Sequence, residues 1–122
     1  MFGIIFLSIA STALATDQHL KTCEHSSAGN GKCDGTLNIN DTIPVIVRNI
    51  PAGSYDLEVF SSYKYSNFNC TFYDGSLNKS LKQTNVPTCI GAFTLHHKDF
   101  VKVLIENNSG VSIPFEVNLI KN

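Results

Sequence analysis

The last segment of the chain alternates apolar and polar residues, and this pattern constrains the fold more than any other feature. Between residues 111 and 119 every second side chain is apolar: Val111, Ile113, Phe115, Val117 and Leu119. A period of two places these side chains on one face of a β-strand, whereas a helix needs a period of about 3.6. Pro114 lies on the opposite face and has no backbone N–H, which predicts a sheet edge or a bulge there.

Similar short patterns recur along the chain, separated by turn signals rich in Pro, Gly, Asn and Asp. The other predicted strands cover residues 36–40, 43–48, 54–61, 69–73, 90–95 and 100–106. No segment has the amphipathic period of a helix. The sequence therefore predicts an all-β fold, a small antiparallel β-sandwich or jelly roll of six or seven short strands. Residues 76–88 have no apolar period and are predicted to form a long loop.

The first 15 residues have the features of a cleaved signal peptide. An apolar run at residues 2–10 is followed by Ala13-Leu14-Ala15, the A-x-A pattern that signal peptidase accepts. The run is shorter than the roughly 20 residues that span a bilayer, and no later segment is long and apolar enough. We expect a secreted protein without membrane insertion. Residues 1–15 are then the signal peptide, residues 16–35 an extended segment pinned by a disulfide, and residues 36–122 one β-sandwich domain.

Four cysteines follow the leader, and an even number predicts two disulfides in an exported domain. Three connectivities are possible, and we favour Cys23–Cys33 and Cys70–Cys89 because both bridges close short local loops. The alternative is a zinc site built from Cys23, His25 and Cys33. These residues lack the C-x₂₋₄-C element of structural zinc sites, and thiols oxidise in this compartment.

Four Asn-x-Ser/Thr sequons agree with export and predict a glycoprotein, with candidate acceptors at Asn40, Asn69, Asn78 and Asn107. Charged residues make up 16% of the chain and the net charge is −1, so there is neither a basic patch nor an acidic tail. We therefore expect no nucleic-acid partner. The sequence leaves the oligomeric state open.

No residue pattern predicts a catalytic site. His96 and His97 are adjacent, so on a strand they face opposite sides and cannot act together on one substrate. Asp56 and Glu58 share a strand face, where neighbouring carboxylates are more often solvated charges than a glycosidase pair. The chain has no G-x-S-x-G elbow and no H-E-x-x-H zinc motif. We expect a protein that is not an enzyme and has no cofactor.

Calcium is the ion that the sequence leaves open. The oxygen ligands that turns could bring together are Asp74, Asp99, Glu106, Asn107 and Asn108. They lack the spacing of an EF-hand loop, and Asp and Asn are also ordinary turn residues. The simpler interpretation is turn chemistry without a metal.

One segment, residues 63–68, combines three aromatic rings with Lys and Asn, the residue types common in binding loops. Its candidate binding residues are Tyr63, Lys64, Tyr65, Asn67 and Phe68. In one interpretation they recognise a protein or a glycan. In the other, which we favour, the rings pack over the open end of the sandwich.

Several short motifs lie in the second half of the chain. They are Cys70 and Cys89, Tyr73-Asp74-Gly75, Phe100-Val101-Lys102-Val103, Asn107-Asn108-Ser109-Gly110 and Pro114-Phe115-Glu116-Val117. Together they resemble secreted CUB-type domains. The resemblance implies a jelly-roll sandwich, sequential disulfides and a non-catalytic role in extracellular interactions. The family's calcium-binding acids are not carried over, because the strand before the Asp-Gly turn is here only Thr71-Phe72-Tyr73.

These observations predict a secreted, non-catalytic glycoprotein that binds an extracellular protein or glycan through loops at one end of a β-sandwich. One alternative is a host-directed or immune-modulating protein that acts through a flat surface or a dimer edge. Another is a small secreted hydrolase whose site is assembled by folding. A deep pocket with His96 or His97 beside a carboxylate would favour the hydrolase.

Overall fold

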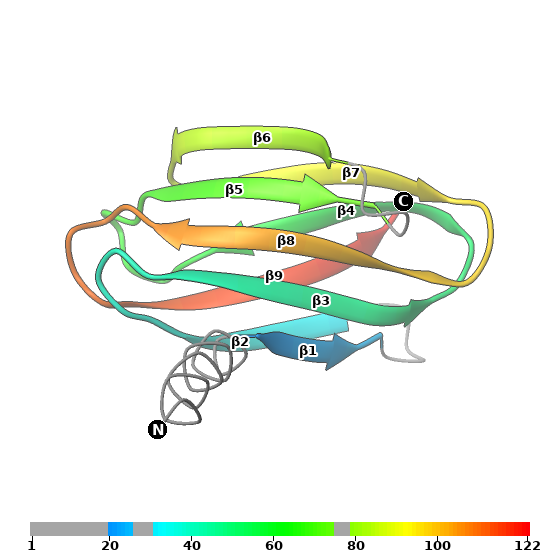
Figure 1. Ribbon diagram of the computed structural model, residues 1–122, viewed down its shortest axis with the longest axis horizontal. Helices are drawn as coiled ribbons and strands as arrows, with labels where there is room; N and C mark the ends of the chain where they lie inside the picture. The colour runs from blue at the N-terminus through cyan, green and yellow to red at the C-terminus, as the bar shows by residue number, and fades with distance from the viewer. Residues whose placement is uncertain (1–19, 26–30, 75–78) are drawn as a thin grey trace, which may run out of the picture.

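The computed structural model describes residues 20–25, 31–74 and 79–122, and these residues form β-strands and no helix (Figure 1). The strands are β1 (Lys21–Glu24), β2 (Gly31–Leu37), β3 (Thr42–Ile50), β4 (Gly53–Phe60), β5 (Phe68–Tyr73), β6 (Lys79–Val86), β7 (Cys89–Leu95), β8 (Asp99–Asn107) and β9 (Ile113–Lys121). Six of them match the predicted strands in place. β2 shares only Thr36 and Leu37 with the strand predicted at residues 36–40, and β1 and β6 are additional.

The strands form two sheets packed face to face (Figure 1). The five-stranded sheet has the order β1-β3-β8-β5-β6, and the four-stranded sheet has the order β2-β9-β4-β7. Neighbours are antiparallel except β1 and β3, which run parallel. The predicted all-β sandwich is confirmed.

The core lies between the sheets and contains most of the residues that the period of two places inward. In β8 and β9 these are Val101, Val103, Ile105, Ile113, Phe115, Val117 and Leu119, and all are buried. Val111 is the exception in the last segment, because it lies before β9 and is exposed. Phe72 of β5 meets Phe93 of β7 edge to face at a centroid distance of 6.0 Å. Beside this pair lies Gly91, where an added Cβ would come within 2.8 Å of the Phe72 ring. The sheets approach so closely here that only a glycine fits without a shift.

Both disulfides join one sheet to the other. Cys23 of β1 is bonded to Cys33 of β2, and Cys70 of β5 to Cys89 of β7, so the favoured connectivity is confirmed. The first bridge connects the edge strands β1 and β2. The second connects β5, next to the opposite edge, to the edge strand β7. Each bridge therefore closes a short loop in the sequence, as predicted, and also links the two sheets of the sandwich. Such bonds are typical of oxidising compartments outside the cytoplasm.

The predicted loop at residues 76–88 is wrong for most of its length, because residues 79–86 form β6. β6 pairs with β5 on one side only and is the edge of its sheet, so it does not need an apolar period. Its shift in register opposite Cys70 further obscures any pattern.

The predicted start of the sandwich at residue 36 is also wrong. β1 and β2 lie before that boundary for most of their length and add one strand to each sheet. β2 was missed before Thr36 because its sequence, GKCDGTL, is rich in residues with low strand propensity. Pairing with β9 and the Cys23–Cys33 bridge hold it in place.

β9 is an interior strand of its sheet, so the edge predicted at Pro114 is confirmed only locally. Pro114 pairs with Thr36 of β2, but on its other side β4 reaches only as far as Glu116. The predicted signal peptide, residues 1–15, lies outside the described residues and stays a prediction. Within the described ranges, no helix is long and apolar enough to cross a membrane.

Candidate functional site

The outer face of the five-stranded sheet has apolar side chains around one lysine. Lys102 lies at its centre: Ile46 of β3 and Tyr73 of β5 are its register partners on either side. Phe100 and Leu104 flank it two residues away on β8 and therefore lie on the same face. All five are half-buried. We call this set, together with Pro44, the apolar face.

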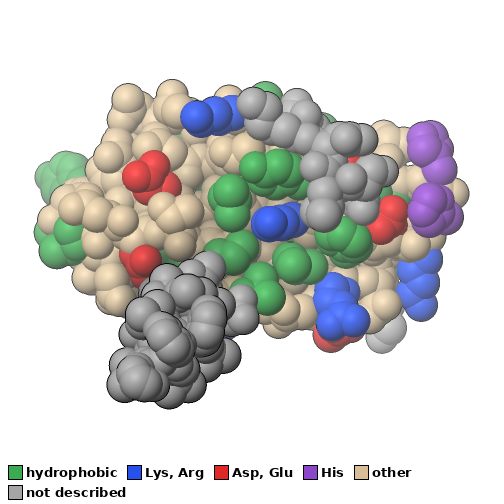
Figure 2. Space-filling model, in the orientation of Figure 1, with side chains coloured by type: hydrophobic (Ala, Val, Ile, Leu, Met, Phe, Trp, Pro, Cys, Tyr) green, Lys and Arg blue, Asp and Glu red, His purple; other side chains and the backbone are tan. Residues whose placement is uncertain are grey.

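Figure 2 views this side of the molecule and shows hydrophobic side chains gathered around a basic one near its middle. The ammonium of Lys102 lies 5.4 Å from the centroid of the Tyr73 ring, in a cation–π contact. The lysine is therefore held along the sheet surface by its neighbours, with its charge beside an aromatic ring.

An open depression of about 610 Å³ continues the apolar face toward one end of the sheet. Its lining includes Leu20, Ile46 and Phe100, with Arg48 and Lys98 at its border. Asn49 donates a hydrogen bond to Glu24, and the same carboxylate lies 3.9 Å from the guanidinium of Arg48. The depression therefore combines apolar side chains with two basic groups, Arg48 and Lys98, and with two acids: Asp99 in its lining and Glu24 beside Arg48.

The outer face of the four-stranded sheet has a different character. Its outward residues include four acids: Asp34, Asp56, Glu58 and Glu116. Asp34 and Glu116 are register partners on β2 and β9. The exposed apolar side chains Ile90 and Ile120 are register partners of two of these acids, Glu58 and Asp56.

The predicted binding loop is divided by the structure. Phe68 is completely buried as the first residue of β5, and Tyr63 packs against the core. Asn67 is half-buried, and its side chain accepts a hydrogen bond from Asn108. Lys64 and Tyr65 are exposed, with Tyr65 at 67%. A binding role for Phe68 is therefore ruled out, and packing accounts for two of the three rings.

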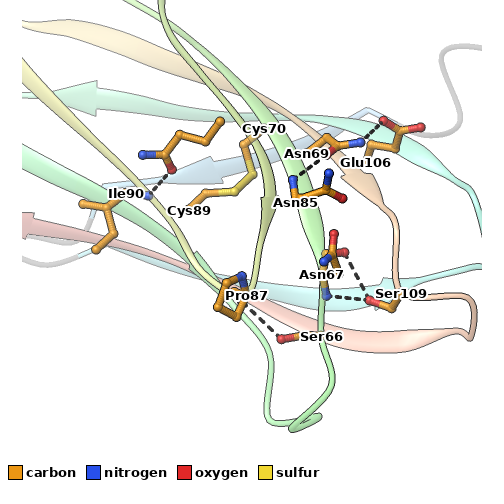
Figure 3. The surroundings of a disulfide bond; sticks show 11 residues. Ser66, Asn67, Asn69, Cys70, Asn85, Pro87, Cys89, Ile90, Glu106 and Ser109 are labelled. Carbon is orange, nitrogen blue, oxygen red and sulfur yellow. Dashed lines mark hydrogen bonds between the residues drawn. A yellow bond between two sulfur atoms is a disulfide. The ribbon is translucent and has the colours of Figure 1, made fainter.

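Hydrogen-bonded asparagines connect β5, β6 and the β8–β9 turn beside the Cys70–Cys89 bridge (Figure 3). Asn69 donates to Glu106 at 2.8 Å and accepts from the backbone N–H of Asn85 at 2.9 Å. Asn108 donates to Asn67 and to Asn85. These hydrogen bonds connect the start of β5 and the end of β6 to the turn between β8 and β9.

Asn107 is completely buried, which contradicts its prediction as a glycan acceptor. Its amide nitrogen donates to the carbonyls of Leu37, Asn38 and Val111 at 3.2, 3.1 and 2.7 Å. Its side-chain oxygen accepts from the N–H of Ser109 at 2.9 Å. A sequon is a local motif and gives no information about burial.

The other sequons have different positions. Asn40 is exposed in the turn between β2 and β3, and Asn69 is half-buried in the asparagine network. Asn78 lies outside the described residues. Asn40 therefore has the surface placement that an acceptor needs.

The candidate catalytic groups lie on exposed surfaces. His97 is 3.3 Å from the carboxylate of Asp99, but its side chain is 78% exposed, and neither His96 nor His97 lines the depression near the apolar face. Asp56 and Glu58 lie side by side on the outer face of β4. The deep pocket that would favour a hydrolase is therefore not found at these residues.

The candidate metal ligands do not converge. Cys23 and Cys33 are bonded to each other, which removes the zinc alternative. Of the calcium candidates, Asp99 begins β8 whereas Glu106, Asn107 and Asn108 lie at its other end, about 23 Å or more away for a strand of this length. Asp74 follows β5, whose last residue pairs with Lys102 near the Asp99 end. In the described part of the chain, no three His, Cys, Asp or Glu residues are grouped to hold a metal.

Comparisons with known proteins match the fold and no family. Neither the family models nor the curated proteins searched give a match, so the CUB-type resemblance is not confirmed. The structure is similar to the pre-peptidase C-terminal domain of collagenase from Bacillus anthracis, with a TM-score of 0.58 and 14% identity over 82% of this chain and 93% of that one.

Two other solved structures are similar to the same extent. The Yersinia pseudotuberculosis-derived mitogen has a TM-score of 0.57 and 10% identity, over 76% of this chain and 86% of that one. PliG of Aeromonas hydrophila, a periplasmic inhibitor of g-type lysozyme, has a TM-score of 0.54 and 13% identity, over 84% and 97%. At these identities the similarity shows a shared β-sandwich fold alone.

The sequence reasoning missed the apolar face. The signal was present in residues 100–106, where both the inward residues and the alternate residues Phe100 and Leu104 are apolar. A strand with apolar residues on both faces needs something to cover each face. Only the register of β3, β8 and β5 shows that Ile46 and Tyr73 extend the second face.

Proposed function

We propose that the protein is a secreted, non-catalytic binding protein whose apolar face docks onto an extracellular partner protein. The observation that carries this proposal is the ring of apolar side chains around Lys102 on a sheet face. The core is complete without these outward residues. Contiguous apolar patches at a surface are typical of interaction sites.

The charges around the apolar face define the chemistry of the partner. Burying the ammonium of Lys102 in an interface costs free energy unless an opposite charge pairs with it. In the adjoining depression Arg48 is paired with Glu24, and Lys98 lines the wall together with Asp99, so Lys102 is the charge at the centre of the apolar face on which the choice of partner rests. The partner we infer presents an apolar surface with a carboxylate near its centre. A glycan, a lipid surface and a second copy of this chain are the competing occupants.

Export, glycosylation and the lack of catalysis belong to the same proposal. The A-x-A pattern after the first apolar run and the two disulfides support secretion. The exposed sequon at Asn40 supports a glycan. All four cysteines are bonded, and His97 is largely exposed, so neither is arranged as an activated nucleophile or base. PliG, an inhibitor of g-type lysozyme, has a similar sandwich fold, and it supports the proposal by fold analogy alone.

The test compares two variants that add the same charge on opposite faces. Leu104→Asp places a carboxylate beside Lys102, whereas Asn118→Asp places one at a half-buried outward position of β9. The purified secreted protein and both variants are screened against a display library of extracellular protein domains. We expect a partner that binds the wild type and Asn118→Asp but binds Leu104→Asp at least about tenfold more weakly, a loss of about 1.4 kcal/mol.

Several outcomes would overturn this proposal. Binding that Leu104→Asp leaves unchanged would move the site away from the apolar face. Selective binding to a glycan array or to anionic vesicles, lost in Leu104→Asp, would replace the protein partner with that ligand. Sedimentation that shows a dimer broken by Leu104→Asp alone would assign the face to a second copy. A melting curve of each variant confirms that it is folded.

A further inference from the structure

We propose that the fold selects one sequon of the described chain for glycosylation: the folded protein has a glycan on Asn40 and none on Asn107 or Asn69. The inference rests on the proposed export through a glycosylating secretory pathway and is independent of the apolar face. It is carried by the opposite environments of three asparagines with the same local motif.

The chemistry of transfer sets the requirement for an acceptor. The side-chain amide nitrogen forms a bond to the anomeric carbon of a lipid-linked oligosaccharide. The bond from that carbon to the polyprenyl diphosphate breaks, and the diphosphate leaves with one amide proton. The modified asparagine therefore keeps a single N–H, and its nitrogen needs open space for a sugar.

Asn107 meets neither requirement in the folded state. Its nitrogen uses both hydrogens in bonds to three carbonyls, and the residue has no exposed surface. The hydroxyl of Ser109, the third sequon residue, is also engaged: it accepts from the N–H of Asn67 and donates to the Asn67 carbonyl. A glycan on Asn107 would break these bonds and leave buried carbonyls without donors. The folded protein therefore excludes this modification.

Asn69 is held in a similar way. Its nitrogen donates to Glu106, and its oxygen accepts from the backbone of Asn85. The middle residue of its sequon, Cys70, is buried in the bridge to Cys89. A glycan would leave this nitrogen one N–H for Glu106, but the sugar would have to fit at a half-buried position between that carboxylate and the edge strand β6.

Asn40 has the opposite environment. It is the third residue of the turn that the hydrogen bond from the Asp41 N–H to the Asn38 carbonyl closes, it is exposed, and its φ is +58°. Asparagine tolerates this left-handed conformation better than most residues. Asn107 shapes the turn, because its side chain donates to Asn38 and its backbone N–H donates to the Asp41 carbonyl. The buried sequon thus holds the turn that presents the exposed one.

The experiment is site-resolved mass spectrometry on protein secreted by cultured mammalian cells. N-glycans are released enzymatically in ¹⁸O-water, which converts each occupied asparagine to a labelled aspartate. We expect the label on Asn40 in most molecules and unmodified Asn107 and Asn69 in the monomeric fraction. Thr42→Ala and Asn40→Gln should both remove the Asn40 label and leave secretion intact.

A labelled Asn107 or Asn69 in folded, secreted monomer would overturn the proposal, and so would an Asn40 that stays unlabelled in secreted wild type. Asn107→Gln keeps an amide but not its position, and we expect most of it to be retained in the cell. Asn108→Gln is the neighbouring exposed control, which also keeps the Asn107 sequon. Leu104→Asp should keep its Asn40 glycan, so failure of the binding proposal and failure of this one are distinguishable.

Discussion

The two outer faces of the sandwich belong to strands of similar length and similar alternation, but they carry different chemistry. On the five-stranded sheet, apolar side chains surround Lys102, whereas on the four-stranded sheet the outward positions include four acids. The buried residues of the inner faces are apolar, except for Asn107 at the end of β8. Folding requires only the inner faces, so the difference between the outer faces needs another cause. The proposed interaction, confined to one side of the molecule, would supply that cause.

The first prediction has the largest expected effect and compares the stability contributed by an inward and an outward residue of β5. Phe72→Ala removes a completely buried ring that contacts Phe93, and we expect a loss of about 3–5 kcal/mol in the free energy of unfolding. Tyr73→Ala removes the neighbouring ring on the apolar face and should cost about 1 kcal/mol or less. Urea denaturation measures both losses. Equal losses would show that the apolar face is part of the structural core.

Periodicity predicts the inward residues well because it depends only on neighbours in sequence. The buried sets in β4, β8 and β9 follow directly from it. β1 was not predicted because four residues give too short a pattern, and its parallel pairing with β3 is a contact distant in sequence. The apolar face is a property of three strands in register. β8 alone shows only the part formed by Phe100 and Leu104.

The asparagines show, for single residues, that a local sequence motif does not determine burial in the fold. Asn40 and Asn107 have the same sequon pattern, but one is exposed in a turn and the other is completely buried. Whether an amide nitrogen is free depends on carbonyls about seventy residues away in sequence. In the predicted binding loop, likewise, it is the tertiary fold that buries Phe68 and leaves Tyr65 exposed.

The second prediction concerns the bridges that hold the two faces together. Replacing both cysteines of either bridge with alanine should cost about 3 kcal/mol, because each bridge limits the freedom of the unfolded chain. The loss of Cys70–Cys89 should be the larger one, since its loop is 19 residues rather than 10 and both cysteines are buried. Thermal unfolding of the two double variants measures the difference. A greater loss from Cys23→Ala with Cys33→Ala would contradict this ranking.

The third prediction tests the close contact between the sheets at Gly91. Gly91→Ala adds a methyl group within 2.8 Å of the Phe72 ring, and we expect a loss of about 1–3 kcal/mol as the ring shifts. Ala92→Ser, one residue along and exposed on the acidic face, should change stability by less than about 0.5 kcal/mol. Each variant adds one non-hydrogen atom, and the two atoms lie on opposite sides of the sheet. A neutral Gly91→Ala would mean that the sheets can separate locally.

The fourth prediction has the smallest expected effect and concerns the cation–π contact on the apolar face. Lys102 lies 5.4 Å from the Tyr73 centroid, and Lys64 lies 5.1 Å from that of Tyr65 in the exposed loop. Distance alone would make the loop pair the stronger one. Cation–π attraction increases with desolvation, however, and Lys102 and Tyr73 are half-buried whereas Lys64 and Tyr65 are exposed.

Double-mutant cycles with Lys→Met and Tyr→Leu at each pair measure the two coupling energies. We expect about 0.5–1 kcal/mol for Lys102 with Tyr73, and a smaller value for the loop pair. A larger coupling in the loop would mean that the apolar face is as well hydrated as an ordinary surface. The expected order would instead mean that the lysine is already partly desolvated before any partner binds. Docking an apolar surface around it would then cost less than burying a fully hydrated charge.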